Sequence, residues 1–255
     1  MMRYLRFLMA LMLSLALAAC VTTPRNSQSV PASRESAVAH TNLAMGYYEL
    51  GQLGTAIDEL NLAKEADATY PNIYNGFGLV YSYTDENEKA RANFERALQL
   101  DPTNSEFRFN WGWFLCTSGR AAASLPEFDR VIADPLYKTP EIALTNAGRC
   151  AYVSGNIEAA KTYLNRALVV KPGYPEASFT LADIAYRQGA YQEARARMRP
   201  VAQSATPAVD HLFLGVCIER RLNDKSSEQA YISRLRSLYP NSEQTKLAIR
   251  REGCK

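Results

Sequence analysis

The stretch Pro71–Asn104, PNIYNGFGLVYSYTDENEKARANFERALQLDPTN, decides the fold of this 255-residue chain. It places the small Gly78 in its first half and the bulky Tyr74 and Phe94 on either side of the midpoint. Small side chains let two helices approach closely, and bulky ones fill the space between them. Pro102 cannot continue a helix, so it ends the second one. The stretch therefore predicts one helix–turn–helix unit.

The same spacing returns every 34 positions from Ala37 onward. A bulky residue, a Leu-Gly-like pair, Tyr, Ala, Phe, Ala and Pro follow one another in an order that resembles the tetratricopeptide repeat family. Six consecutive units predict an all-α fold, a tetratricopeptide repeat superhelix or α-solenoid. No alternating strand pattern of useful length occurs in the sequence. The six units begin at or near Ala37, Pro71, Ser105, Glu141, Pro175 and Ala208.

Prolines and glycines mark the expected ends of the helices. Five prolines each follow an amphipathic run, and four glycines lie at turns inside repeats, where a left-handed residue is needed. Repeat three departs from the pattern by two extra residues around Asp134–Tyr137, and repeat six has Leu222 in place of the turn glycine. The prolines are Pro102, Pro135, Pro172, Pro207 and Pro240, and the glycines are Gly51, Gly119, Gly155 and Gly189.

The first twenty residues carry the features of an export signal with a lipid attachment site. Positive charge precedes an uncharged apolar run over residues 7–17, which is shorter than the roughly 20 residues that a membrane helix needs. The run closes on Leu17-Ala18-Ala19-Cys20, which resembles a bacterial lipobox. Small residues before a cysteine suit signal-peptide cleavage, so we expect Cys20 to be acylated and to head the mature chain. The alternative is an ordinary secretory signal with a chance cysteine.

The composition downstream predicts the domain organisation. Residues 21–36, VTTPRNSQSVPASRES, contain few large apolar side chains and cannot bury enough surface to fold. We expect a lipoprotein signal peptide over 1–19, the acylated Cys20 with a flexible tether over 20–36, and a six-repeat domain over 37–255. Val21 stands where bacterial lipoproteins that stay at the inner membrane tend to carry Asp. We therefore expect a lipid anchor in the outer membrane, on its periplasmic face.

Charge and motif content exclude several classes of function. The chain has 29 basic and 26 acidic side chains, a net charge of +3 that falls to +1 when Arg3 and Arg6 leave with the signal peptide. A nearly neutral chain lacks the charge that binds nucleic acid. The two histidines, His40 and His211, lie far apart, and no metal, P-loop or serine-hydrolase signature occurs. We expect no enzyme, no cofactor or metal, and no small-molecule substrate.

Four cysteines remain besides Cys20, an even number that favours disulfides in the oxidising periplasm. Cys116 falls late in the first helix of repeat three and Cys150 in the first helix of repeat four, and such helices stack side by side. This pair could meet at the roughly 5.5–6 Å Cα separation of a disulfide. A second pair, Cys217 and Cys254, would tie the C-terminal tail to repeat six. Buried free thiols are the alternative for each pair.

The first helix of each repeat lines the concave surface of such a superhelix, so its inward positions are candidates for partner binding. Each of the first four repeats supplies one asparagine, whose amide offers a donor and an acceptor to an extended peptide. Aromatic, Met and Arg neighbours supply contact area, as at protein interfaces. Bracing of neighbouring helices is the alternative role for the asparagines. The candidates are Asn42, Met45, Tyr48, Asn75, Leu79, Tyr83, Phe109, Asn110, Trp113, Asn146, Arg149 and Tyr152.

The whole arrangement resembles the type IV pilus biogenesis lipoprotein family, the PilF/PilW secretin pilotins. The resemblance rests on the lipobox, the tether, the six repeats, the asparagine series and the Cys116/Cys150 pair. It implies that the partner is the secretin subunit of the type IV pilus and that the groove holds a secretin segment. The lipid on Cys20 would deliver the pair to the outer membrane, where secretin multimerisation follows from placement and local concentration.

Two other functions fit the same sequence. One is a general periplasmic tetratricopeptide adaptor lipoprotein that recruits proteases or cell-wall enzymes. The other is a subunit of the machinery that inserts β-barrel proteins into the outer membrane. A fold of this kind does not by itself decide among them.

Overall fold

The computed structural model describes residues 33–254, which form thirteen helices and contain no strand. Twelve helices make six antiparallel pairs, one for each expected repeat, and a short thirteenth helix follows. The pairs are α2 (Arg34–Glu49) and α3 (Leu53–Ala66), α4 (Pro71–Tyr83) and α5 (Asn87–Leu100), α6 (Ser105–Thr117) and α7 (Ala121–Ala133), α8 (Pro140–Val153) and α9 (Ile157–Val170), α10 (Pro175–Arg187) and α11 (Tyr191–Gln203), and α12 (Val209–Arg221) and α13 (Lys225–Leu238), followed by α14 (Glu243–Arg250).

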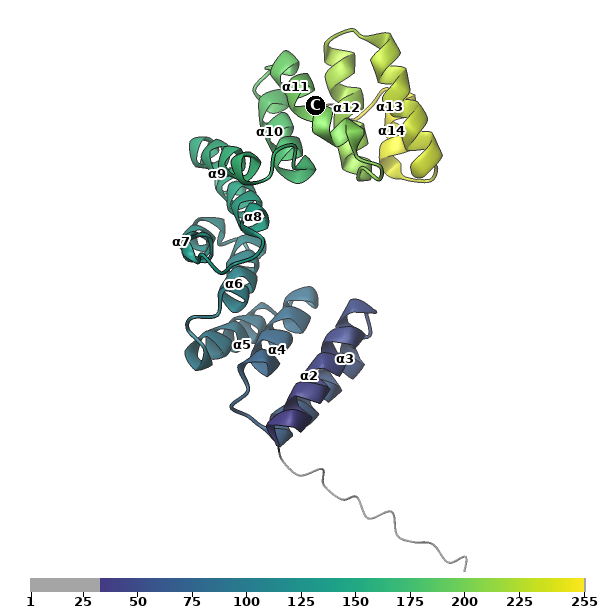
Figure 1. Ribbon diagram of the computed structural model, residues 1–255. Coiled ribbons are helices and arrows are strands. Elements are labelled where there is room, and N and C mark those ends of the chain that lie inside the picture. Colours follow the sequence, from purple (N-terminus) through teal and green to yellow (C-terminus); the bar gives the residue numbers. More distant parts are fainter. Residues whose placement is uncertain (1–32, 255) are drawn as a thin grey trace, which may run out of the picture.

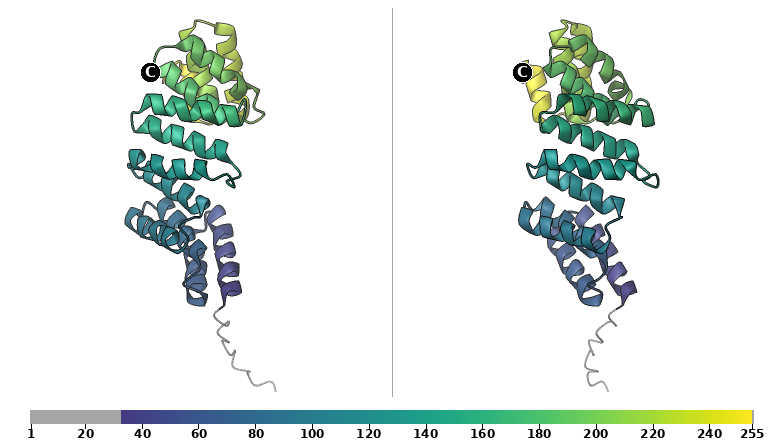
Figure 2. Two further views of the ribbon diagram at one scale, coloured as in Figure 1. Left: turned by 60° about the vertical axis from the view of Figure 1, so that its left-hand side comes forward. Right: turned by 90° about the vertical axis from the view of Figure 1, so that its left-hand side faces the viewer.

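The pairs stack into a curved array, shown in Figure 1 and from two further sides in Figure 2. The first helices α4, α6 and α8 lie on the inner side of the curve, and their partners α5, α7 and α9 lie on the outer side (Figure 1). The expectation of an all-α superhelix of six tetratricopeptide repeats is confirmed. The stack places one surface of each first helix where a long partner segment can contact several repeats at once.

The folded domain begins slightly earlier than the sequence predicts. Helix α2 starts at Arg34, and the side chain of Ser33 caps it by accepting a hydrogen bond from the Ser36 backbone at 3.1 Å. The predicted tether therefore overlaps the first helical turn, because a serine cap lies inside a stretch whose composition is polar. The predicted signal peptide, the acylated Cys20 and most of the tether lie outside the described residues.

Close contact between the two helices of a repeat explains the repeating small residues. A Cβ atom added at Gly78 would lie 2.7 Å from the ring of Phe94, and one at Gly148 would lie 2.6 Å from Leu164 Cγ. Phe94 and Leu164 are themselves fully buried, so they cannot move aside. Helix pairs can pack at this distance because glycine has no side chain there.

The turns inside the repeats use left-handed residues in all six units. Glycine fills this position in repeats one, three, four and five, as the sequence predicts. Asp85 in repeat two and Asn223 in repeat six adopt positive φ angles of 59° and 57°. Asn and Asp tolerate this conformation better than other non-glycine residues, so the missing glycine of repeat six is replaced by its neighbour Asn223.

Both cysteine pairs are bonded in the structure. The Cys116–Cys150 disulfide joins α6 to α8 with a Cα–Cα distance of 5.6 Å. It spans the junction that carries the two extra residues, where Tyr137 packs against Phe109 with ring centroids 6.3 Å apart. The Cys217–Cys254 disulfide joins α12 to the chain end.

Helix α14 and the tail after it close the C-terminal end of the stack. Ala248 of α14 is fully buried in a cluster with side chains of α12 and α13, including Leu212 and Leu235. Arg220 donates to the Ala248 carbonyl at 3.0 Å, and Arg221 donates to the Cys254 carbonyl at 3.1 Å. The cap of the array is thus a separate helix, because repeat six itself is a complete helix pair.

Candidate protein-binding face

The twelve candidate residues all lie on first helices. Three come from each of α2, α4, α6 and α8, which follow one another along the curve (Figure 1). We call the surface that they mark, together with its continuation on α10 and α12, the inner face. Contacts between successive first helices run along it, so its side chains form a continuous series from repeat one to repeat six.

An aromatic pair marks the N-terminal end of the inner face. The rings of Tyr48 on α2 and Tyr83 on α4 meet edge to face, with centroids 6.1 Å apart. Burial, and then the neighbouring Tyr83, raise the pKa of Tyr48. Tyr83 is nevertheless 68% exposed, and Met45 beside this pair is partly exposed. These side chains offer apolar contact area to a partner.

The four asparagines do not share one role. Asn110 Nδ2 donates to Asn75 Oδ1 at 3.1 Å, which joins α6 to α4, and Asn75 is only 7% exposed. Asn146 Nδ2 donates to the Ile142 carbonyl of its own helix at 3.0 Å. Asn42 is exposed. Two members of the series therefore brace neighbouring repeats, which is the alternative that the sequence leaves open.

The middle of the inner face combines packing with an exposed charge. The Arg149 guanidinium on α8 lies 5.4 Å from the ring centroid of Trp113 on α6, a cation–π contact. Phe109 packs against Phe128 of α7 at 5.7 Å and is part of the repeat's interior. Leu79 likewise packs against the buried cluster around Phe94. Among Leu79, Phe109, Trp113 and Arg149, only Arg149 is exposed to a partner, and the other three are partly buried.

Contacts continue into repeats five and six, beyond the candidates that the sequence analysis names. Burial, and then the Asp183 carboxylate, raise the pKa of Tyr152. Arg221 on α12 donates to the Tyr186 hydroxyl of α10 at 3.5 Å. The repeat spacing could have revealed these residues, because Asp183 and Tyr186 follow Arg149 and Tyr152 by 34 positions.

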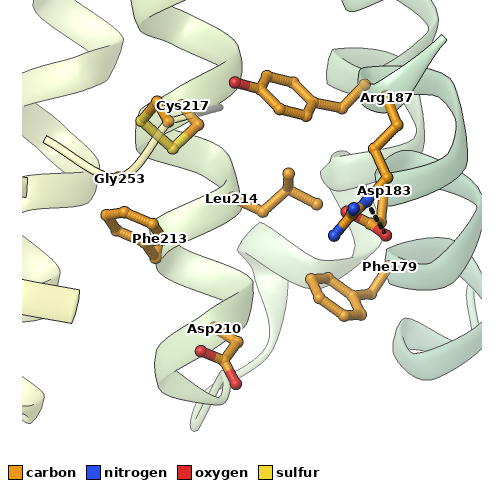
Figure 3. Close-up of a pocket in the computed structure, with 10 residues that line it drawn as sticks. Phe179, Asp183, Arg187, Asp210, Phe213, Leu214, Cys217 and Gly253 are labelled. Carbon is orange, nitrogen blue, oxygen red and sulfur yellow. Dashed lines mark hydrogen bonds and ion pairs between the residues drawn. A yellow bond between two sulfur atoms is a disulfide. The ribbon is translucent and has the colours of Figure 1, made fainter. Parts of the chain in front are cut away.

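A pocket of about 340 Å³ opens between α10 and α12 (Figure 3). Phe179 and Asp183 lie on its α10 side, and Asp210 and Phe213 lie on its α12 side (Figure 3). The tail residue Gly253 also lines it. The repeat pattern does not predict this pocket, because Gly253 and Cys254, which follow the last helix, form one of its walls.

The two histidines lie in different repeats, His40 on α2 and His211 on α12. His40 Nδ1 lies 2.7 Å from Glu59 Oε2, and His211 stacks on Phe179 with ring centroids 4.1 Å apart. Residues 33–254 contain no cluster of His, Cys, Asp and Glu suited to a metal ion. No helix in that range has the length and hydropathy to span a membrane.

Family models describe two parts of the chain as tetratricopeptide repeats, residues 71–104 and residues 145–203. These segments correspond to the pair α4–α5 and to most of the helices α8–α11. Proteins built from such repeats are typically scaffolds that bind other proteins. The match agrees with the six helix pairs of the structure.

Known type IV pilus proteins resemble the chain over most of its length. The type IV pilus assembly protein PilF of Pseudomonas aeruginosa is 25% identical over 239 residues, 93% of this chain and 95% of that protein. The crystal structure of PilW, a widely conserved type IV pilus biogenesis factor, matches with a TM-score of 0.75 and 30% identity over 84% of this chain and 98% of that one. A structure of Pseudomonas aeruginosa PilF has a TM-score of 0.72 and 23% identity over 86% and 98%. With this agreement in sequence, length and fold, the chain belongs to the PilF/PilW family of tetratricopeptide-repeat type IV pilus biogenesis proteins.

Proposed function

We propose that this protein is an outer-membrane lipoprotein that binds the type IV pilus secretin through its inner face and promotes secretin localisation and multimerisation. The observation that carries the proposal is the likeness to PilW, at 30% identity over 98% of that chain. Membership of the PilF/PilW family supports a role in pilus biogenesis, and the tetratricopeptide fold supports binding to another protein. The secretin as partner is our inference.

The inner face supports a role in holding an extended segment. It offers exposed aromatic area at Tyr83 and an exposed guanidinium at Arg149, both on first helices. Aromatic and Arg side chains contribute most of the binding energy at protein interfaces. The Asn75–Asn110 bond and the Cys116–Cys150 disulfide hold neighbouring repeats in place, so little ordering is left for the moment of binding.

The proposed lipid on Cys20 would hold the protein at the outer membrane. An anchored protein and its partner meet at an effective concentration set by the tether, which raises the extent of association without new contacts. The polar composition of residues 21–36 supports our proposal that the segment 20–36 is a flexible tether, which would give the folded domain reach. Secretin assembly at the outer membrane then requires no bond chemistry from this protein.

Deletion of the gene tests the function as a whole. We expect the deletion strain to lose surface pili and to contain secretin monomers where the parent strain has multimers, measured on gels of unboiled envelope. A Cys20→Ser variant should restore few multimers at the outer membrane, because it cannot be acylated. Normal secretin multimers in the deletion strain would reject the proposal and favour a general periplasmic adaptor. A loss of many unrelated outer-membrane β-barrels would favour a subunit of the insertion machinery.

A pair of matched variants tests the inner face. Tyr83→Ala removes an aromatic side chain that is 68% exposed on α4, and Leu136→Ala removes an apolar side chain that is 85% exposed in the loop before α8. We expect Tyr83→Ala to weaken binding to the purified periplasmic part of the secretin about tenfold, the effect of losing a contact of about 1.4 kcal/mol. Leu136→Ala should bind normally. Equal affinities for both variants would place the binding surface elsewhere.

A further inference from the structure

The pocket between α10 and α12 has aromatic walls and an acidic rim. Phe179 and Phe213 line it from the two helices (Figure 3), and Leu214 and the buried Tyr186 also line it. Its volume of about 340 Å³ falls in the range of small-ligand sites. One long side chain with its backbone fits such a space.

The pocket is held in shape from the C-terminal side. The Cys217–Cys254 disulfide fixes the tail against α12. Arg221 donates to the Cys254 carbonyl at 3.1 Å, and Arg220 donates to Cys254 Sγ at 3.4 Å. A Cβ atom at Gly253 would lie 3.0 Å from the Phe213 ring, so this part of the tail packs closely on the wall. One disulfide and two arginine side chains therefore hold this wall in position.

Charges in the pocket favour a cation. Asp183 forms an ion pair with Arg187 at 3.0 Å, so these two side chains neutralise each other. Asp210 is exposed, accepts one hydrogen bond from Gln244 at 2.8 Å on Oδ1, and forms no ion pair within residues 33–254. Its carboxylate remains the uncompensated charge of the rim. An incoming anion would meet this carboxylate, whereas an incoming cation would be paired by it.

We propose that this pocket binds one arginine side chain of the extended partner segment. The planar guanidinium can stack on Phe213, or on the face of Phe179 opposite His211, and pair with the Asp210 carboxylate. Lysine fits the charge but lacks a flat group to stack. This proposal rests on the proposed function and adds to it a required residue in the partner.

The assignment also gives the bound segment a direction. The N-terminal end of the inner face offers the apolar side chains of Met45, Tyr48 and Tyr83. The C-terminal end offers the acidic rim around Asp210. A segment with apolar residues at one end and an arginine at the other matches the face in one orientation only.

Binding of two short peptides tests the pocket without the secretin. The probes are acetyl-Gly-Arg-Gly-amide and the same peptide with citrulline, which has arginine's shape but no charge. Ligand-observed NMR measures their binding to the full-length protein in detergent with both disulfides oxidised. We expect the arginine peptide to bind about fivefold more tightly, the ratio for a partly exposed ion pair of about 1 kcal/mol. Equal affinities for the two peptides would overturn the proposal.

A matched pair of variants locates the effect. Asp210→Asn removes the charge and keeps the shape, and Glu95→Gln removes an exposed charge on the outer helix α5. Neither side chain is buried in the core, so both variants should fold. We expect the preference for arginine over citrulline to vanish in Asp210→Asn and to persist in Glu95→Gln. A preference that survives in Asp210→Asn would overturn the assignment.

Measuring secretin binding by the wild type and by Asp210→Asn tests the pocket assignment and the proposed function separately. If the wild-type protein binds the arginine peptide as expected but no secretin, the pocket assignment stands and the proposed function fails. If wild type and Asp210→Asn bind the secretin equally well, the proposed function stands and the inference fails. A loss of about fivefold in secretin affinity for Asp210→Asn alone would support both.

Discussion

The hydrogen bond between Asn75 and Asn110 shows why residues of one type on one surface can differ in role. We predict that Asn75→Ala lowers the free energy of unfolding by about 1–2 kcal/mol, because it leaves the half-buried Asn110 amide without its 3.1 Å acceptor. Asn42→Ala is the control, since Asn42 is exposed, and it should change stability by less than about 0.5 kcal/mol. Urea unfolding followed by circular dichroism measures both. Equal effects of the two variants would contradict the bracing role.

His211 makes the stability of the C-terminal repeats depend on pH. Its ring stacks on Phe179, and burial lowers its pKa below the ordinary 6.5, against the opposing effect of Glu176 and Asp210. Protonation is thus harder in the folded state than in the unfolded state. The contribution of neutral His211 is fully present above pH 6.5 and declines as the pH falls below this value towards the folded pKa. The pH range of the loss is therefore the mildly acidic one.

We predict that His211→Phe flattens this dependence. The aromatic ring keeps the stack on Phe179 and removes the titrating group. As the pH falls from 7.5 to 5, the melting temperature of the wild type should fall relative to that of the variant, because only the wild type carries the imidazole whose folded-state pKa is lowered. An unchanged difference across the whole range would show that another group is responsible.

At the scale of the helices, glycines fix how closely each pair can pack. We predict that Gly78→Ala costs about 1–3 kcal/mol, because the added methyl group overlaps the fully buried ring of Phe94. The control is Gly46→Ala in α2, where an added Cβ has no neighbour within 4 Å. That change should stabilise the protein by about 0.5–1 kcal/mol, since Ala is the better helix former. Thermal unfolding compares the two, and a stabilising Gly78→Ala would refute the packing argument.

The Cys116–Cys150 disulfide secures the junction between repeats three and four. It closes a loop with a sequence separation of 34 residues, for which chain entropy gives a stabilisation of about 3–4 kcal/mol. We predict a loss of this size for the Cys116→Ala/Cys150→Ala variant, measured by urea unfolding without reductant. An unchanged midpoint would show that the packing around the two extra residues already holds the junction.

The sequence predicts the helix pairs well because small and bulky residues recur at fixed spacing, and this spacing directly reflects contact between two helices. It predicts less well where a local cap replaces the repeat pattern. Ser33 starts the first helix inside a polar stretch, and Asn223 supplies the left-handed turn that Leu222 does not. Such replacements depend on the preference of a single residue, and a pattern defined over all the repeats does not show the preference of one residue in one repeat.

The candidate site was predictable in its helices and not in its individual roles. Position in the repeat places Asn75 and Asn110 on first helices, but the distance that joins them follows from the angle between repeats. Similarly, Phe109 packs both on Phe128 of its own repeat and on Tyr137 of the enlarged junction. The pocket at Asp210 requires a tail that the Cys217–Cys254 disulfide brings back to α12. These features depend on contacts between parts of the chain that lie far apart in the sequence.

The whole molecule behaves as a one-dimensional array, because each repeat contacts chiefly its neighbours. The C-terminal repeat is covered by α14 and its tail. The apolar side chains of repeats one and two and the acidic pocket near the cap therefore lie at opposite ends of one face. A partner held along this face would be oriented relative to the proposed membrane anchor.

Loss of the α14 cap should consequently destabilise only the C-terminal repeat. We predict that deletion of residues 241–255 exposes the cluster that Ala248 covers on α12 and α13, and removes the 2.7 Å bond from Thr245 Oγ1 to the Tyr239 carbonyl. Hydrogen exchange of the deletion variant should show faster exchange in α12 and α13 and unchanged protection in α2–α9, because stability in a repeat array is a sum over neighbours. The control, Cys217→Ala/Cys254→Ala, loses the disulfide but keeps α14, so its protection in α13 should be largely retained. Faster exchange in every repeat would instead show that the six units unfold as one, and unchanged exchange in α12 and α13 would show that α14 is no cap.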